Sequence, residues 1–316
     1  MLLRKIVSLI LMTLCAFAMF GINDNAGTTG FNNLQIVYSA KAMSMAQAMT
    51  GIGASIDGLQ FNPAAILKVE NANVSTTFSS YLVDSNGGAI HMLLPRNENV
   101  TLGMQLHYLN FGQIDRTVLT EDNEYLDMHE TFGASNMIIG LSAARYINPS
   151  IDLGITLKYI YDKIDTYSAS AVVADLGMIH HPFNEKIKVG IALRNIGAQT
   201  TYYTDNKYPE KLPFTFAGGL SYQIRPNLQC AMDISKPKGP DLTIRFGADY
   251  KVHPMLNLRA GYSNNSSNWV TGGNLDWASG LTFGAGFQWQ KYVLDYGVAS
   301  YGNLGFINQI SLNYKF

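Results

Sequence analysis

From about residue 71 to the C-terminus, apolar and polar residues alternate along the chain with a period of two. Leu153, Ile155 and Leu157, for example, are separated by Gly154 and Thr156. Such alternation places one kind of side chain on each face of a β-strand. The alternating segments are 71–83, 86–94, 99–111, 133–147, 150–163, 168–180, 186–197, 213–225, 227–235, 241–252, 255–264, 278–289, 291–300 and 304–316. The sequence therefore predicts an all-β protein of about fourteen strands.

The connections between these segments are alternately short and long. Several of the even-numbered connections contain proline, which cannot donate to a strand ladder and suits a turn. The three long connections, 112–132, 198–212 and 265–277, all fall among the odd-numbered ones. Outer-membrane barrels have short periplasmic turns and longer external loops. We therefore predict a transmembrane antiparallel β-barrel in the bacterial outer membrane, with these three loops outside.

The composition agrees with a barrel. Only 14% of the residues are charged, the net charge is −1 and the mean hydropathy is +0.03. In a barrel, apolar residues that face lipid offset polar residues that face the lumen. The charge balance gives no basis for nucleic acid as a partner. The alternative is a large soluble β-sandwich or propeller, but no repeat of about 40 residues supports a propeller.

The N-terminus has the features of a secretory signal peptide, which we assign to residues 1–25. Arg4 and Lys5 precede an apolar stretch over 6–21 that is shorter than the roughly 20 residues of a membrane-spanning helix. An uncleaved anchor helix is the alternative. A lipoprotein modified at Cys15 is disfavoured because Leu14 occupies the position where a small residue is expected.

Residues 26–70 lack the alternation of the strands. The stretch 40–49 is rich in helix formers and small residues, and Gly51 and Gly53 then end it. A wide barrel has a lumen that is either filled or wet. We interpret residues 26–70 as a partly helical hatch in the lumen of a barrel formed by residues 71–316. The alternative is a periplasmic helix across the lower mouth.

Three short motifs of this segment resemble the PorV/PorQ family, outer-membrane proteins related to the long-chain fatty-acid transporter barrels. They are Ala40-Lys41-Ala42-x-Ser44-Met45-Ala46, the region of Asp57, and Asn62-Pro63-Ala64. Ala65 and Ile66 replace the Gly and Leu of the family motif, so the local turn is expected to differ. The resemblance implies a fourteen-stranded barrel with an N-terminal hatch. It also implies type IX protein secretion for some members and passage of hydrophobic molecules for the transporter relatives.

The sequence predicts no catalytic, metal or cofactor site. His129 and Glu130 begin a zinc-protease pattern, but Gly133 occupies the position of the second histidine. The acidic segment 112–132 lacks the ligand spacing of a calcium loop. We therefore expect a non-enzymatic protein without a cofactor.

Five residues of the hatch are candidates for a binding site, namely Met43, Met45, Met49, Asn62 and Pro63. Methionine adapts to irregular binding surfaces, and a concave apolar pocket beside a few polar groups is typical of small-molecule sites. The alternative is that these side chains only fill space. Lumenal polar neighbours are expected from the wall: Lys158, Arg194, Arg245, Asp249 and Arg259.

The C-terminal strand ends on Tyr314 and Phe316, which resembles the terminal signal that the barrel assembly machinery reads. The expected partners are this machinery, outer-membrane lipid, secretion-system components or secreted proteins, and a hydrophobic ligand. The leading hypothesis is a PorV/PorQ-type barrel that assists secretion or transport. The alternatives are a transporter of hydrophobic small molecules such as fatty acids, and a structural or adhesin-like barrel.

Overall fold

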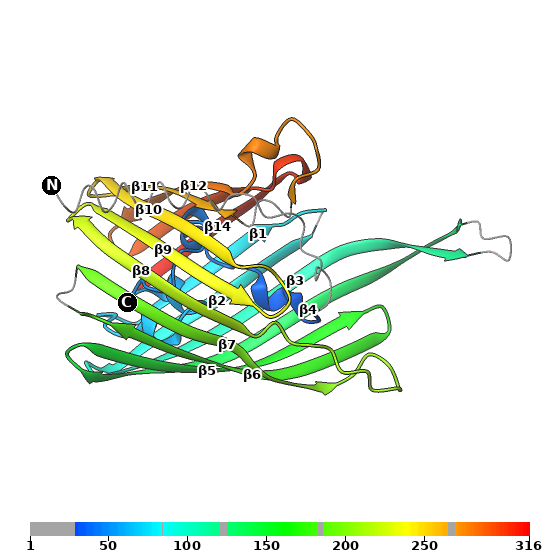
Figure 1. The fold of residues 1–316 in the computed structure, drawn as a ribbon, viewed down its shortest axis with the longest axis horizontal. Helices are drawn as coiled ribbons and strands as arrows, with labels where there is room; N and C mark the ends of the chain where they lie inside the picture. The colour runs from blue at the N-terminus through cyan, green and yellow to red at the C-terminus, as the bar shows by residue number, and fades with distance from the viewer. Residues whose placement is uncertain (1–28, 84, 120–124, 183–185, 265–268) are drawn as a thin grey trace.

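Fourteen antiparallel strands close into a single barrel in the computed structural model, which describes residues 29–83, 85–119, 125–182, 186–264 and 269–316 (Figure 1). The first strand pairs with both the second and the last, so the sheet closes on itself. The predicted fold is therefore confirmed. The strands are β1 (Asn73–Ser80), β2 (Asn86–Asn97), β3 (Val100–Leu119), β4 (Tyr125–Asn148), β5 (Ile151–Ile164), β6 (Tyr167–His180), β7 (Ile187–Thr201), β8 (Thr215–Arg225), β9 (Leu228–Pro237), β10 (Thr243–His253), β11 (Leu256–Ser263), β12 (Leu281–Trp289), β13 (Tyr292–Ser300) and β14 (Phe306–Lys315), with short 3₁₀ turns η5 (Asp276–Ala278) and η6 (Gly302–Leu304) between them.

The period-two pattern gives the barrel wall two chemically different faces. On β5, Leu153, Ile155 and Leu157 point outward and are 42%, 43% and 58% exposed, whereas Asp152 and Thr156 are buried in the lumen. The same apolar exterior continues around the wall, with Phe78, Leu141, Leu220, Phe283 and Ile310 among its members. So much contiguous apolar surface is a lipid-facing surface. The chain is a transmembrane β-barrel of the bacterial outer membrane.

Strands β3 and β4 continue beyond the rim as a two-stranded ribbon (Figure 1). The sequence predicts a loop over 112–132, but β3 continues to Leu119 and β4 begins at Tyr125. Pairing resumes after a register shift, with Gln113 opposite Gly133. β-Branched and aromatic residues favour extended pairing here, although carboxylates interrupt the apolar alternation. The loop prediction is therefore wrong for most of this segment.

Residues 29–70, the hatch, lie inside the barrel (blue in Figure 1). Helix α2 begins after Ser39, whose Oγ accepts a hydrogen bond from the N–H of Ala42, and it ends before Ala46 and Gln47, which adopt positive φ. The helical elements are η1 (Asn32–Gln35), α2 (Ala40–Ser44), η2 (Ile56–Gly58) and η3 (Pro63–Ile66). Within the described ranges, no helix is long and apolar enough to cross a bilayer.

The hatch packs against glycines of the inner wall. Neighbouring strands bring pairs of them into register, with Gly247 opposite Gly261 and Gly190 opposite Gly219. A methyl group on Gly247 would lie 2.6 Å from the carbonyl oxygen of Met45, closer than atoms pack. Glycine inside a strand often marks such a close backbone approach. We call this set the glycine belt: Gly154, Gly177, Gly190, Gly219, Gly247, Gly261, Gly284 and Gly297.

Candidate functional site

Wall side chains hold the hatch through its backbone. Asp233 on β9 accepts hydrogen bonds through Oδ2 from the N–H groups of Met49 (3.1 Å) and Thr50 (2.8 Å). On β12, Thr282 accepts from the N–H of Ala46 (3.0 Å) and donates to the carbonyl of Ser44 (3.1 Å). These bonds satisfy buried hatch groups that water does not reach. Together with the glycine belt they fix the backbone of the hatch in the lumen.

Asn62 and Pro63, two of the predicted site residues, belong to this attachment. The Asn62 amide donates to the carbonyls of Thr50 (2.8 Å) and Met178 (3.0 Å), while its Oδ1 accepts from the N–H of Ala64 (3.1 Å). Pro63 is buried and opens η3 at a position where proline loses no helical hydrogen bond. The structure places both residues against the wall rather than at a cavity.

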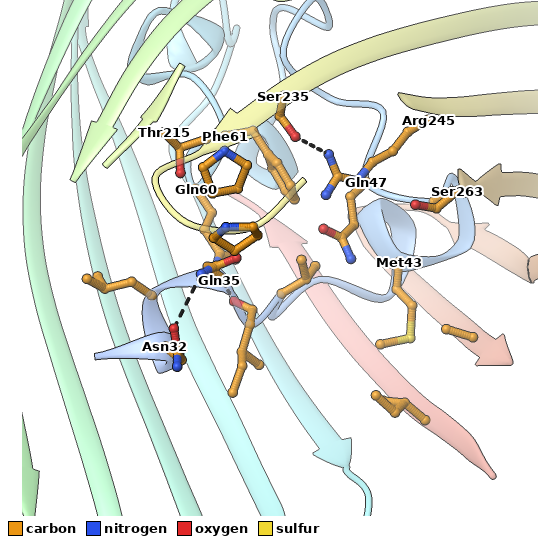
Figure 2. Close-up of a pocket in the computed structure, with 18 of the residues that line it drawn as sticks. Asn32, Gln35, Met43, Gln47, Gln60, Phe61, Thr215, Ser235, Arg245 and Ser263 are labelled. Atoms are coloured by element: carbon orange, nitrogen blue, oxygen red, sulfur yellow. Dashed lines mark hydrogen bonds between the residues drawn. The ribbon is translucent and has the colours of Figure 1, made fainter. Parts of the chain in front are cut away.

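A cavity of about 400 Å³ lies between the hatch and the half of the wall that ends in the long loops (Figure 2). We call it the outer cavity. Its apolar lining comes from both hatch and wall: Leu34, Val37, Met43 and Phe61 from the hatch, and Ala299 and Ile307 from β13 and β14. Its polar lining includes Gln35, Gln47 and Gln60 of the hatch. The volume falls within the range of small-molecule pockets.

Two arginines of the wall line the outer cavity, Arg194 on β7 and Arg245 on β10. The Arg194 guanidinium lies 5.8 Å from the ring centroid of Phe61, and its Nε is buried without a hydrogen-bond partner. Arg245 donates to Ser235 and lies beside Gln47 in Figure 2. Asp233 lies within electrostatic reach of both; its Oδ2 accepts from the hatch backbone, and its Oδ1 has no hydrogen-bond partner. The cavity therefore presents cationic donors with unused hydrogen-bonding capacity.

The rim of the outer cavity is aromatic. Trp269 and Tyr301 stack with ring centroids 4.0 Å apart, and Tyr81 lies beside them in the lining. Burial raises the pKa of Tyr301, and the neighbouring Tyr81 raises it further. Both phenols therefore stay neutral near pH 7, and their hydroxyls are hydrogen-bonded to each other, with the Tyr301 O–H donating to Tyr81.

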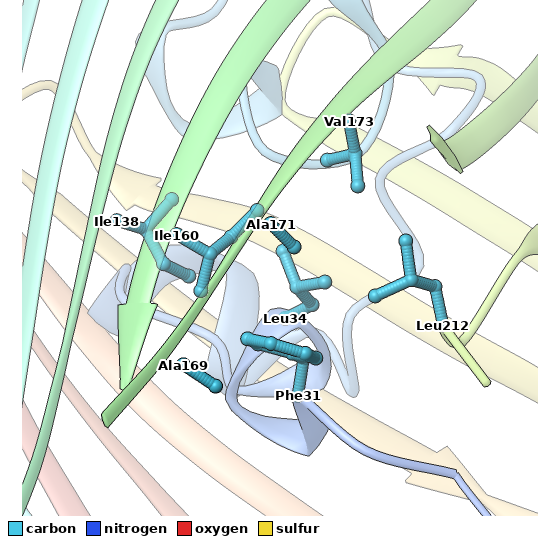
Figure 3. Packing of buried hydrophobic residues seen from close by; sticks show 8 residues of the cluster. All are labelled: Phe31, Leu34, Ile138, Ile160, Ala169, Ala171, Val173 and Leu212. Atoms are coloured by element: carbon cyan, nitrogen blue, oxygen red, sulfur yellow. The ribbon is translucent and has the colours of Figure 1, made fainter. Parts of the chain in front are cut away.

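The first residues of the hatch close the opposite side of this space. Phe31 and Leu34 pack against Ile138, Ile160 and neighbouring small residues of the wall, with Leu212 from the connection between β7 and β8 (Figure 3). Below them, Asn33 donates to Asp162 on β5 (3.0 Å). The hatch is thus fastened at its start as well as along the glycine belt.

A second cavity, of about 440 Å³, lies on the short-turn side of the hatch. We call it the inner cavity. Arg259 on β11 bridges Asp249 (3.0 Å) and Asp295 (2.6 Å) in its wall, and Lys41 of α2 faces Asp57 at 4.0 Å. Lys68, Glu70 and Lys315 also line it. The lining is mainly charged.

The three predicted methionines occupy different environments. Met43 lines the outer cavity, whereas Met45 and Met49 are fully buried in the core formed by the hatch and Ala231. Ala46 and Gln47 adopt positive φ and end the helix, so the three methionine side chains do not share one helical face.

Tyr314 and Phe316 lie at the short-turn end of the barrel. Their rings are 4.9 Å apart, and Tyr314 also contacts Tyr292 on β13 at 5.0 Å. The N–H of Phe316 donates to the carbonyl of Ala72. The last residue is therefore paired in the barrel closure, and its side chain is 57% exposed.

Sequence reasoning missed Asp233, Trp269 and Tyr301. Asp233 occupies a lumenal position of β9, so its place in the alternation signalled a polar contact, but nothing in the sequence identified the hatch N–H groups as its partners. Trp269 and Tyr301 lie in connections, where the period of two gives no information.

The fold and these cavities define a class: an outer-membrane barrel whose lumen is filled by a fixed hatch, with a cavity on each side. Similar solved structures include the Pseudomonas putida toluene transporter TodX (TM-score 0.64, 11% identity, covering 88% of this chain and 96% of that one). The CymD monoaromatic hydrocarbon channel gives a TM-score of 0.62 at 12% identity, covering 89% and 98%. A Pseudomonas aeruginosa FadL homologue gives 0.57 at 11% identity, covering 89% and 99%.

At these identities the likeness shows the fold alone. No family model and no curated protein matches the chain. The resemblance seen in the sequence is thus supported at the level of the FadL-type barrels, and these comparisons contain no support for the PorV/PorQ family. The similar structures are channels and transporters rather than enzymes.

Proposed function

We propose that the protein is a channel for small hydrophobic molecules, with the outer cavity as its binding site. The observation that carries the proposal is a cavity of about 400 Å³ whose apolar lining comes from both hatch and wall. Because the hatch supplies part of the lining, any movement of the hatch changes the site. The similar barrels that are named as toluene and monoaromatic hydrocarbon channels support transport over secretion.

The lining also bears on the chemistry of the ligand. Arg194 and Arg245 of the lining offer cationic donors. A ligand with an apolar body and one carboxylate or other acceptor group would satisfy both parts of the lining. A pure hydrocarbon would leave the buried Nε of Arg194 without a hydrogen-bond partner, which is unfavourable.

The test compares the binding of a medium-chain fatty acid, the matching fatty alcohol and toluene to the purified barrel. We expect the acid to bind tightest, and Arg194→Gln to weaken it about tenfold through the loss of a charge-assisted hydrogen bond. The control is Arg145→Gln, because Arg145 is exposed at the short-turn end of β4.

If all three ligands bind equally well to both variants, the ligand does not need an acceptor group, and the proposal reduces to a hydrocarbon channel. If none of the three ligands binds and a secreted protein co-purifies with the barrel, the channel proposal is rejected and the secretion hypothesis is favoured.

A further inference from the structure

Two connections at the long-loop end form one rigid unit. The carboxylate of Asp276 accepts hydrogen bonds from the N–H groups of Gly272 (2.7 Å) and Gly273 (3.0 Å), and from the amide of Asn303 (2.7 Å). Asn303 belongs to η6, in the next connection along the barrel, and also accepts from the N–H of Leu275 (3.3 Å). We call residues 269–280 and 301–305 the outer loop pair.

The outer loop pair displays apolar side chains that nothing within it covers. Trp277 is 77% exposed, Val270 and Leu304 are each 50% exposed, and Leu275 is 42% exposed. They are held on an ordered scaffold, because Asp276 and Asn303 fix the backbone around them. An ordered, exposed apolar cluster of this kind marks a surface that has a partner.

The same segments carry almost no charge. Asp276 is the one acidic residue in 269–280 and 301–305, which contain no Lys, Arg or His. Its carboxylate is engaged by backbone N–H groups of the same segment. A surface with several apolar residues and a single, hydrogen-bonded charge favours an apolar partner over a charged one.

The position of the unit identifies the partner. In Figure 1 the connection between β11 and β12 (orange) stands clear of the wall, to the side of the barrel rather than across its end. Lipid-facing residues close to this end of the neighbouring strands, Phe283 on β12 and Phe306 on β14, are 54% and 52% exposed. The apolar cluster therefore continues the lipid-facing surface beyond the last hydrogen-bonded residues of the strands.

We propose that the outer loop pair is a membrane-docking surface that rests on the lipid of the outer leaflet, with Trp277 inserted at the lipid–water interface. The indole combines a large apolar ring with one N–H donor, which suits the boundary between acyl chains and head groups. The surface is independent of the ligand of the outer cavity, because none of its four exposed side chains lines that cavity.

The chain contains three tryptophans, and each reports a different environment. Trp289 lies on the lipid-facing side of β12 at the short-turn end and is 56% exposed. Trp269 is half-buried, stacks on Tyr301 and faces the outer cavity. Single-tryptophan proteins made with Trp→Phe substitutions therefore provide the test residue, Trp277, together with a lipid-exposed reference and a cavity-facing control.

The experiment measures fluorescence quenching in vesicles of brominated phosphatidylcholine and, separately, by acrylamide in water. We expect the Trp277-only protein to be quenched by brominated lipid to the same extent as the Trp289-only protein, and the Trp269-only protein to be quenched much less. Adding Asp276→Ala to the Trp277-only protein should lower the lipid quenching, because the scaffold is lost. Heat-modifiable migration confirms that each variant is a folded barrel.

Strong acrylamide quenching of Trp277 without lipid quenching would overturn the proposal and leave a water-facing surface. Protection from both quenchers that disappears on dilution of the protein in the vesicles would also overturn it, in favour of a contact with a second copy of the chain.

Discussion

The outer and inner cavities have similar volumes but different linings, and a single short hatch segment separates them. Met43 and Gln47 face the outer cavity, whereas Lys41, two residues before Met43, faces the inner one. The outer lining combines aliphatic and aromatic surface with a few donors, while the inner lining is mainly charged. An apolar molecule thus gains contacts on one side of the hatch and finds water and ion pairs on the other.

The difference between the two linings indicates which residues determine ligand affinity and which determine the stability of the barrel. In the outer cavity, the Nε of Arg194 has no hydrogen-bond partner within the protein, and Met43 lines the space available to a ligand. Inner residues such as Arg259 are fully engaged with their neighbours. We therefore expect substitutions in the outer cavity to alter binding, and substitutions in the inner cavity to alter the stability of the barrel.

The largest effect, on conductance, is expected from displacing the hatch segment that separates the two cavities. In Gly219→Val the new side chain would meet the hatch backbone, since even a Cβ atom there would lie 2.6 Å from the N of Gly51. Overpacking of this kind costs roughly 1–3 kcal/mol, and displacement of the hatch relieves it. Conductance in planar bilayers should rise as the two cavities connect.

The matched control for this experiment is the adjacent residue. A Cβ atom on Gly218 would meet nothing within 4 Å, so Gly218→Val should leave conductance at the level of the unmodified protein. Equal conductance of the two variants would show that the glycine belt does not hold the hatch in place.

The next effect, on stability rather than on conductance, is expected in the inner cavity. Arg259→Gln removes the cation that contacts both Asp249 and Asp295, and loss of one partner from a buried ion pair costs about 3 kcal/mol or more. The midpoint of urea unfolding should fall, while ligand affinity in the outer cavity should not change. A loss of affinity without a loss of stability would contradict the division between the two cavities.

Met43→Ala tests the outer side with a substitution that carries no charge. Met43 packs with Ala299 and Ile307 where it lines the cavity. Shortening it removes apolar contact with the ligand at about 0.8 kcal/mol per methylene, so affinity should fall about tenfold. Met49→Ala is the control, because Met49 is buried away from the cavity and should lower stability more than affinity.

The smallest effect is expected from acid at the rim. Partial desolvation raises the pKa of Asp276, but hydrogen bonds from the N–H groups of Thr271, Gly272 and Gly273 and from Asn303 outweigh it and hold the pKa below its usual range. The stabilisation that Asp276 provides is therefore complete above the ordinary carboxyl pKa of about 4 and is lost only as the pH falls through the lowered value. Emission from the Trp269-only protein should stay constant from neutral pH down to about 4. A change near pH 6 would identify another titrating group at the rim.

The barrel was predictable because lipid and lumen impose opposite demands on alternate residues of every strand. The length of β3 and β4 was not, since Asp115 and other carboxylates beyond the rim obey no such alternation. The hatch was predicted because residues 26–70 lack the alternation and a wide lumen is either filled or wet, but its contacts with the wall could not be predicted. A glycine such as Gly190 lowers the strand propensity of its segment, and only the folded hatch shows that it marks a close approach to Thr50.

The glycine belt also has a consequence for how such a protein changes during evolution. The wall contacts the hatch mainly through the hatch main chain, which packs on the glycine belt and donates hydrogen bonds to acceptors such as Asp233. Main-chain recognition is indifferent to which side chain the hatch carries on its opposite face. A residue such as Gln35, which lines the outer cavity and bonds only to Asn32 within the hatch, can therefore be exchanged without rebuilding the barrel. Evolution, or a protein engineer, can therefore change the ligand by substituting a few residues of the hatch while its main-chain contacts with the wall stay the same.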